Sequence, residues 1–275
     1  SELYVITFSE AVSRGLLVDY KVIVLTVNES DINRRLGDTL KAKEIIVDDA
    51  AKIVGCWKAL SKQDTREDLK DDADPMRRAV AFCQVIEYKK GGKVHKVSSK
   101  QIAKMFGEVI EAYKQAEMES EGFETELAAT LKCHAEHVDG SMNASEKEAQ
   151  IQWLKQEPPR DTCHILSNVR CLSEGVDVPA LDAVLFLTPR GSQVDVVQSV
   201  GRVMRNAPNK KRGYVILPVV IPAGVEAHQA LNDNKTYKVV WEVLQALRSH
   251  DDRFDALINK MDLELNTSML SKMEV

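Results

Sequence analysis

Four residues near position 200 could together bind a phosphorylated ligand. Gln198, Gly201, Arg202 and Arg205 are related by steps of three and four, so a helix would present all of them on one face. Guanidinium groups form paired hydrogen bonds with phosphate oxygens, and the glycine leaves space beside them. Such a face could clamp a triphosphate, or stabilise the charge that develops when its terminal phosphoryl group is transferred.

A second candidate region precedes this helix. Residues 174–179 read Glu-Gly-Val-Asp-Val-Pro and follow an apolar, strand-like run. Gly175 suits a turn or a close approach of the backbone to a ligand, and the carboxylate of Asp177 suits a sugar hydroxyl. Pro179 opposes a simple helical continuation. The segment therefore predicts a nucleotide contact.

Ordinary structural interpretations exist for both regions. Arg202 and Arg205 could be solvated or ion-paired arginines of a surface helix. Gly175 and Asp177 could be residues of a plain turn or a helix cap. Without the order of motifs described below, these alternatives would be preferred for the arginines.

The elements that must hold these residues follow from hydrophobic patterning. Six short runs, rich in β-branched residues, predict buried strands at 20–27, 79–83, 133–138, 163–167, 183–187 and 214–221. Helical spacing begins at Ser98, and Ser145 with Glu148 predicts a capping box for the helix that carries Leu154. Ser192 with Asp195 resembles the same device. Alternating strands and helices predict an α/β fold with a largely parallel sheet that is covered on both faces.

Composition limits the class of protein. The chain has 275 residues, of which 44% are hydrophobic and 29% charged, values typical of a globular protein without a membrane span. Five cysteines without paired spacing predict reduced thiols in a cytoplasmic protein. The net charge of −5 argues against a stand-alone nucleic-acid binder, so any such contact must be local or shared with another segment.

A zinc site is the other chemical hypothesis for this chain. Cys133, His134 and His137 lie close in sequence, and His164 could lie on a neighbouring strand. In a strand, Cys133 and His134 would point to opposite faces, which favours a buried thiol with peripheral histidines.

The motifs, taken in order, resemble those of superfamily 2 helicases. Residues 198–205 resemble motif VI, and residues 174–179 resemble motif V. Residues 78–84 (Arg-Ala-Val-Ala-Phe-Cys-Gln) resemble motif IV, and residues 137–142 resemble the strand-turn-helix after it. The details are similar to restriction-enzyme motor subunits and related DEAD/DEAH-type helicases, in which residues 8–20 look like the crossing from the first lobe to the second.

This resemblance implies a second RecA-like (P-loop NTPase-type) lobe. Arg205 would be an arginine finger for the γ-phosphate, Arg202 would contact the same phosphates or hold the finger, and Gln198 would orient this cluster or the attacking water. Gly175 and Asp177 would lie against the nucleotide ribose. One DNA strand would be contacted by Gln84, Gly140, Ser141, Asn168 and Arg170. Arg170 stands where such proteins often have an acidic residue or Asn, and it is interpreted as an extra phosphate contact.

Two motifs of a complete motor are missing from the sequence. It contains no G-x-x-x-x-G-K-[ST] loop and no D-E-x-x box, so ATP and Mg²⁺ are expected to be bound mainly by a first lobe. The chain alone is not expected to hydrolyse ATP, and we expect it to be a piece of a longer chain.

The predicted function is the second motor lobe of an ATP-dependent DNA helicase or translocase of restriction-modification type, with DNA and the N-terminal RecA-like lobe as partners. A non-catalytic docking module and the lobe of an RNA helicase are the alternatives. The predicted division is a crossing segment with the first strand (1–27), a helical insertion and linker (28–77), the RecA-like lobe (78–225) and a helical C-terminal extension (226–275). Within the insertion we expect one helix, with Val47, Val54 and Leu60 on one side, and a charged surface linker at 64–75. The extension carries an apolar stripe from Val240 to Met261, which is expected to pack on the sheet or on a partner.

Overall fold

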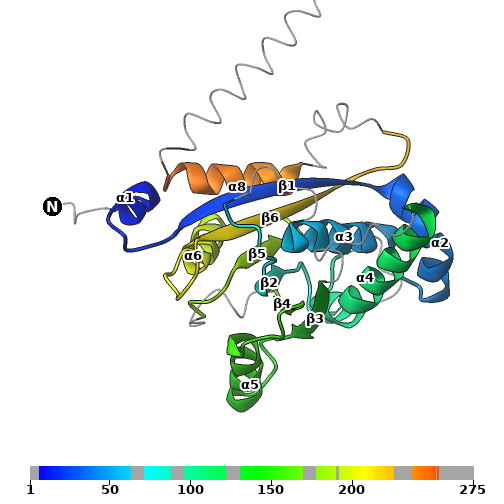
Figure 1. Ribbon diagram of the computed structural model, residues 1–275, viewed down its shortest axis with the longest axis horizontal. Helices are drawn as coiled ribbons and strands as arrows, with labels where there is room; N and C mark the ends of the chain where they lie inside the picture. The colour runs from blue at the N-terminus through cyan, green and yellow to red at the C-terminus, as the bar shows by residue number, and fades with distance from the viewer. Residues whose placement is uncertain are drawn as a thin grey trace, which may run out of the picture.

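The computed structural model describes residues 6–62, 71–87, 96–121, 131–169, 178–189, 192–225, 237–251 and 253. Its centre is a six-stranded sheet with the order β1-β6-β5-β2-β4-β3, in which every pairing is parallel (Figure 1). The strands are β1 (Asp19–Asn28), β2 (Arg78–Phe82), β3 (Lys132–His137), β4 (Thr162–Asn168), β5 (Ala183–Phe186) and β6 (Arg212–Ile221). Each of them overlaps one of the six strands predicted from the sequence.

Seven helices are described around this sheet. They are α1 (Phe8–Ser13), α2 (Glu29–Ala42), α3 (Val47–Ser61), α4 (Ser99–Glu121), α5 (Ala144–Lys155), α6 (Gln193–Val203) and α8 (Lys238–Arg248). Helices α3 and α4 pack on one face, with α2 against both of them, whereas α6 and α8 pack together on the other (Figure 1). The predicted α/β fold, with a parallel sheet covered on both faces, is confirmed. No helix among the described ranges is long and apolar enough to span a bilayer.

The two faces of the sheet carry separate cores, because successive strand residues point to opposite sides. In β2, Ala79 and Ala81 belong to the core under α3 and α4, whereas Val80 and Phe82 belong to the core under α6 and α8. Phe82 stacks on Phe186 of β5 with ring centroids 5.4 Å apart. A strand that is buried on both faces needs an unbroken apolar run, which explains why the sequence identified these strands well.

The region expected to hold one helix and a linker holds two helices. Helix α3 matches the predicted helix, but α2 was not predicted, because Ile32, Leu36 and Leu40 form a narrow stripe in an otherwise polar segment. Both helices pack against β1, which pairs with β6 along its whole length. The segment therefore contributes to the main core. The predicted division at residues 27, 77 and 225 stays a prediction.

One predicted helix cap is wrong and one is confirmed. Helix α5 is capped by Asn143, whose Oδ1 accepts from the Glu146 amide at 2.9 Å, while the Glu146 carboxylate accepts from the Asn143 amide at 2.8 Å. The predicted box at Ser145 is two residues late, since Asn is as good an N-cap as Ser. At α6, Ser192 Oγ accepts from the Asp195 amide at 3.3 Å, as predicted.

The apolar stripe of the C-terminal region packs on the sheet as far as it is described. Val240, Leu244 and Leu247 of α8 are buried in the core on the α6 side. The remaining stripe residues, from Phe254 onward, lie outside the described residues.

The cysteine and histidine pattern matches the expectation for a strand. Cys133 is buried and His134 is exposed, so the two side chains point to opposite faces. The His134 ring lies 6.4 Å from that of His164 on β4. Cys56, Cys83, Cys133 and Cys163 are free, buried thiols, and Cys171 lies outside the described residues. Within the described ranges, no three His, Cys, Asp or Glu side chains are grouped as metal ligands.

Residues 71–75, the described part of the charged stretch at 64–75, are tied to the sheet and are not simply a surface linker. The Lys62 side chain, 3% exposed, forms an ion pair with Asp72 at 3.2 Å and donates to the Asp72 carbonyl at 2.6 Å. The Tyr214 hydroxyl donates to the Asp72 carboxylate from β6. Burial raises the pKa of Asp72, but the Tyr214 hydrogen bond and the charge of Lys62 outweigh it, so the pKa lies below its ordinary value. Asp72 therefore fastens this segment to the sheet.

Replacing Tyr214 by Phe is expected to lower the free energy of unfolding by about 1–2 kcal/mol, because the hydrogen bond to the carboxylate is lost. Since the folded-state pKa of Asp72 is lowered, the contribution of this group is present above about pH 4 and is lost as the pH falls further. Urea titrations at pH 7 and pH 3 measure both effects. Tyr237→Phe is the matched control. The pKa of the Tyr237 hydroxyl is raised by burial alone, whereas that of Tyr214 is raised also by the carboxylate of Asp72. Equal losses in the two variants would contradict the role given to Asp72.

Candidate functional site

The carboxyl ends of all six strands meet at one edge of the sheet, which is where open α/β sheets bind their ligands. Gln84 follows β2 by two residues, Asn168 ends β4, and Gly140 and Ser141 follow β3. Phe82 is in register with Asn168, and His137 with Ser167. The parallel topology therefore brings these predicted nucleic-acid contacts to the same edge.

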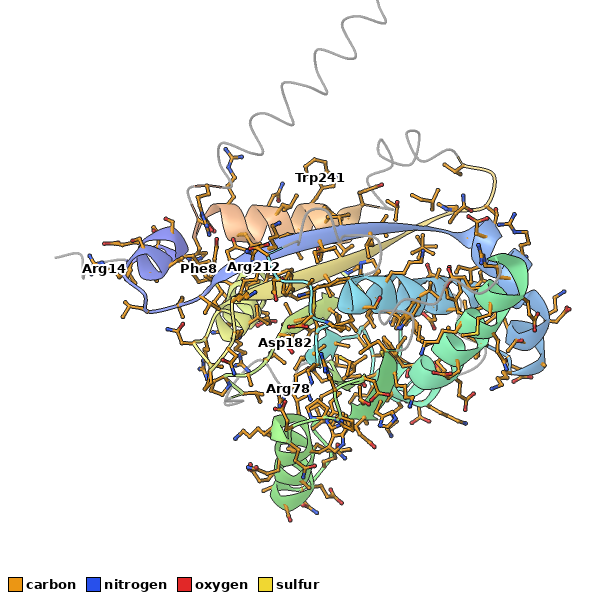
Figure 2. The ribbon with its side chains drawn as sticks, in the orientation of Figure 1. Phe8, Arg14, Arg78, Asp182, Arg212 and Trp241 are labelled. Carbon is orange, nitrogen blue, oxygen red and sulfur yellow. The ribbon has the colours of Figure 1, made fainter. Side chains whose placement is uncertain are left out.

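The opposite edge of the sheet is occupied by structural ion pairs. At the amino end of β2, the amides of Arg77 and Arg78 donate to Asp182 at 2.8 and 3.0 Å, and Arg78 pairs with Glu157 at 2.6 Å. Figure 2 shows Arg78 and Asp182 below β6 in this view, with Arg212 at the start of β6, where it pairs with Asp71. These charges hold strand ends together.

The backbone at Gln84 is fixed, while its side chain is exposed. Its amide donates to the Val97 carbonyl at 3.0 Å, and the preceding Cys83 amide donates to the Asn168 carbonyl at 2.8 Å. The Gln84 side chain therefore extends from a rigid position beside the end of β4. Such a position suits the predicted contact with the backbone of a nucleic acid.

The turn after β3 presents Gly140 and Ser141, which are both exposed. Asp139 Oδ1 accepts from the Ser141 amide at 2.7 Å and also from its hydroxyl, which fixes the turn. A side chain at Gly140 would meet nothing within 4 Å, so the glycine leaves this backbone open to a ligand. Lys147 of α5 donates to the Gly140 carbonyl at 3.3 Å. The sequence interpretation missed Lys147, whose position becomes visible only once α5 is placed.

Asn168 differs from the other predicted contacts. Its side chain is completely buried, and its amide nitrogen donates to the Ala81 carbonyl of β2 at 3.2 Å. A residue in this position holds the ends of β2 and β4 together and does not face a strand of DNA. The prediction grouped Asn168 with the other polar residues that follow strands, because a single sequence does not show which of these side chains are buried.

Helix α6 turns an apolar side to the core and carries the motif VI residues. Val196, Val200 and Val203 are buried, Gln198 is exposed, and Arg202 is partly exposed. The helix ends at Val203, so Arg205 lies in the following turn and not in the helix as expected. The Arg205 amide donates to the Arg202 carbonyl at 3.3 Å, which continues the same turn. Neither arginine is buried.

Contacts from two other segments fix the position of this turn. The Val18 amide donates to the Met204 carbonyl at 2.8 Å, and the Asn206 amide nitrogen donates to the carbonyls of Gly15 and Leu16 at 3.1 and 3.0 Å. On the other side, a Cβ at Gly213 would lie 2.3 Å from the Val203 carbonyl oxygen. The backbone that carries Arg205 is therefore held between β6 and the segment before β1.

The motif V part of the predicted site is not placed. Arg170, Gly175 and Asp177 lie outside the described residues. The structure thus positions the motif VI residues and the carboxyl-edge residues, whereas the predicted ribose contact stays a prediction.

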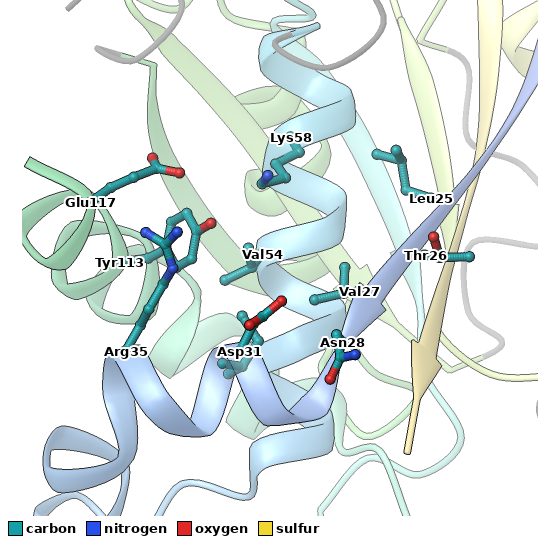
Figure 3. Close-up of a pocket in the computed structure, with 11 residues that line it drawn as sticks. Leu25, Thr26, Val27, Asn28, Asp31, Arg35, Val54, Lys58, Tyr113 and Glu117 are labelled. Carbon is teal, nitrogen blue, oxygen red and sulfur yellow. The ribbon is translucent and has the colours of Figure 1, made fainter. Parts of the chain in front are cut away.

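A pocket of about 340 Å³ opens at the carboxyl end of β1, between α2, α3 and α4. Figure 3 shows Arg35, Lys58, Tyr113 and Glu117 converging in it, with Asp31 below. The Arg35 guanidinium lies 5.7 Å from the centre of the Tyr113 ring. Two basic and two acidic side chains line the space, so its charge favours neither an anion nor a cation.

Residues 79–207 match the family described as "Helicase conserved C-terminal domain". This range includes the motif V and VI residues predicted from the sequence, and all of the motif IV residues except Arg78. The chain is 33% identical over 100 residues to a protein of African swine fever virus named a probable helicase; the alignment covers 36% of this chain and 11% of the relative.

The structure resembles that of the ATP-dependent Type ISP restriction-modification enzyme LlaBIII bound to DNA. The TM-score is 0.76 with 40% sequence identity, and the similarity covers 94% of this chain. The chain spans 16% of the length of that enzyme, so it corresponds to one part of a much larger protein.

Proposed function

We propose, from the match of residues 79–207 to the helicase conserved C-terminal domain, that the chain is the second motor lobe of an ATP-dependent superfamily 2 DNA translocase or helicase, in a cytoplasmic restriction-modification enzyme. The observation that carries the proposal is the fixed turn at the end of α6. It holds Arg202 and Arg205 partly exposed, with their backbone tied to both β6 and the segment before β1.

The chemistry of this turn fits a triphosphate held by another lobe. Guanidinium groups are always charged and match the geometry of phosphate oxygens, and their effect is largest when they are positioned before the reaction begins. Arg205 would stabilise charge on the γ-phosphate, with Arg202 and Gln198 arranged around it. Gly175 and Asp177 would meet the ribose. Mg²⁺, bound mainly by the first lobe with the phosphates, would neutralise part of their charge.

The carboxyl edge of the sheet would form part of the track for the nucleic acid. Gln84, Gly140 and Ser141 would contact the backbone of one strand, with Arg170 as an additional phosphate contact and Asn168 holding the strand ends beneath them. Lys147 adds a positive charge beside Gly140, although the whole chain has a net charge of −5. An acidic chain can still bind a nucleic-acid backbone through local positive charge, because individual side chains and amides make the contacts with the phosphates.

ATPase measurements on the full-length protein test the choice of substrate. We expect duplex DNA or single-stranded DNA to stimulate ATP hydrolysis more than RNA of the same length, and stimulation to fall as salt is raised, because phosphate contacts release counterions. Stronger stimulation by RNA would favour an RNA helicase. A full-length protein without nucleic-acid-dependent ATPase would favour a docking module.

A further inference from the structure

A chain of hydrogen bonds runs from the core to the exposed turn at Ser141. The Ser99 hydroxyl donates to Ser167 Oγ at 3.0 Å, and Ser99 Oγ lies 2.7 Å from His137 Nδ1. His137 Nε2 lies 2.8 Å from Asp139 Oδ2. Asp139 Oδ1 then accepts from the Ser141 amide at 2.7 Å. These five side chains, which we term the His137 relay, link three elements of the fold to one surface turn.

The inner end of the relay is rigid. Ser167 lies in β4 and Ser99 begins α4, and both are completely buried. Ser167 Oγ also lies within hydrogen-bonding distance of two carbonyls, 2.9 Å from that of Ser99 and 3.1 Å from that of Glu136. His137, the last residue of β3, is therefore held from behind by the sheet and by the start of α4.

The relay contains a serine, a histidine and an aspartate, but it is not built for hydrolysis. A nucleophilic serine must reach its substrate, whereas Ser99 has no exposed surface and is already bonded to Ser167. The exposed end of the relay is Ser141. What the arrangement can do is therefore to hold the turn that carries Gly140 and Ser141.

Asp139 transmits this support. One of its oxygens shapes the turn through the Ser141 amide and hydroxyl, and the other is bound by His137. The carboxylate is only 3% exposed, and without His137 it would lose its buried partner and be free to rotate toward solvent. Hydrogen bonds from Ser141 and His137 hold the pKa of Asp139 below its ordinary value, which agrees with a carboxylate that stays charged in this place.

We propose that His137 is a positioning residue for nucleic-acid binding, which acts through Asp139 to hold the Gly140–Ser141 turn in the shape that meets a phosphate backbone. The proposal rests on the function proposed above for this edge of the sheet. It goes beyond that function because it assigns a role to a partly buried residue that does not itself touch the strand.

Two conservative substitutions separate the two arms of the relay. In His137→Gln, the amide nitrogen can reach the position of Nε2 and donate to Asp139. In His137→Asn, the shorter side chain can reach only the position of Nδ1 and contact Ser99. Both remove the ring, so a role in packing alone would affect them alike, whereas action through Asp139 predicts rescue by Gln only.

The test measures DNA-stimulated ATPase and DNA binding of the full-length protein. Losing a hydrogen bond to a charged group in His137→Ala or His137→Asn should raise the DNA concentration for half-maximal stimulation about tenfold, with a smaller change in turnover at saturating DNA. His137→Gln should stay within about twofold of the unmodified protein. Thermal unfolding of each variant reports whether it is folded.

Three outcomes decide the matter. Rescue by Gln and not by Asn supports the proposal. Equal effects of His137→Gln and His137→Asn, or wild-type behaviour of His137→Ala, overturn the role given to His137. The proposed function still stands in that case, provided that DNA stimulates the ATPase of the unmodified protein. An unmodified protein that neither binds DNA nor is stimulated by it overturns both, and RNA in the same assays then identifies an RNA motor.

Discussion

Replacing Arg205 by alanine in the full-length protein is expected to reduce nucleic-acid-stimulated ATP turnover by about 10³–10⁵-fold, the effect of an arginine finger in related phosphoryl-transfer systems. The affinity for ATP should change much less, because the guanidinium acts mainly on charge that develops in the transition state. Single-turnover hydrolysis and equilibrium binding of a nucleotide analogue measure the two quantities separately.

Two variants make this expectation specific. Arg205→Lys keeps the charge but loses the paired donors, so its turnover should lie between those of the alanine variant and the unmodified protein. Arg34→Ala removes an exposed arginine of α2 that pairs with Asp31 on the surface, and it should leave turnover unchanged. An Arg205→Ala protein that hydrolyses ATP within a few fold of the normal rate would refute the assignment and favour a solvated arginine.

The centre of the sheet could be predicted from the sequence because β2, β4, β5 and β6 are buried on both faces. Runs such as residues 214–221 are apolar without interruption, and no exposed element imitates them. Helix α2 was not predicted for the opposite reason, since most of its surface is exposed and only one narrow stripe of it is apolar. Patterning thus detects an element in proportion to the share of it that is buried.

The candidate site was predicted in kind and order, but not in local detail. The residue types of motif VI were sufficient to suggest phosphate binding, yet the sequence did not indicate that α6 would end before Arg205 or that Asn206 and Val18 would tie down its turn. Asn168 shows the same limit, because its burial depends on Ala81, far away in sequence. Long-range contacts of this kind leave no periodic signal in the chain.

Gly213→Ala is expected to have the largest effect on folding among these substitutions. The new methyl group would lie 2.3 Å from the Val203 carbonyl oxygen and 2.7 Å from the carbonyl carbon, and both are backbone atoms at the end of α6. Either β6 or α6 must move, because no side chain can turn away. Overpacking of this severity should lower the free energy of unfolding by about 3 kcal/mol, the upper end of the usual range.

The same substitution also tests whether the position of the turn matters for activity. Gly213 lies against Val203, which is followed by Met204 and Arg205. Any shift that accommodates the methyl group therefore displaces the arginine, so turnover in the folded fraction should fall as well.

Gly37→Ala is the matched control. Its Cβ would meet only the exposed Asn33 side chain at 3.3 Å, and replacing a glycine inside a helix should raise the free energy of unfolding by up to about 1 kcal/mol. Urea titration and ATPase assays of both variants measure these effects. Normal stability and turnover in Gly213→Ala would mean that β6 does not fix the end of α6, and the proposed site would lose one of the contacts that hold it.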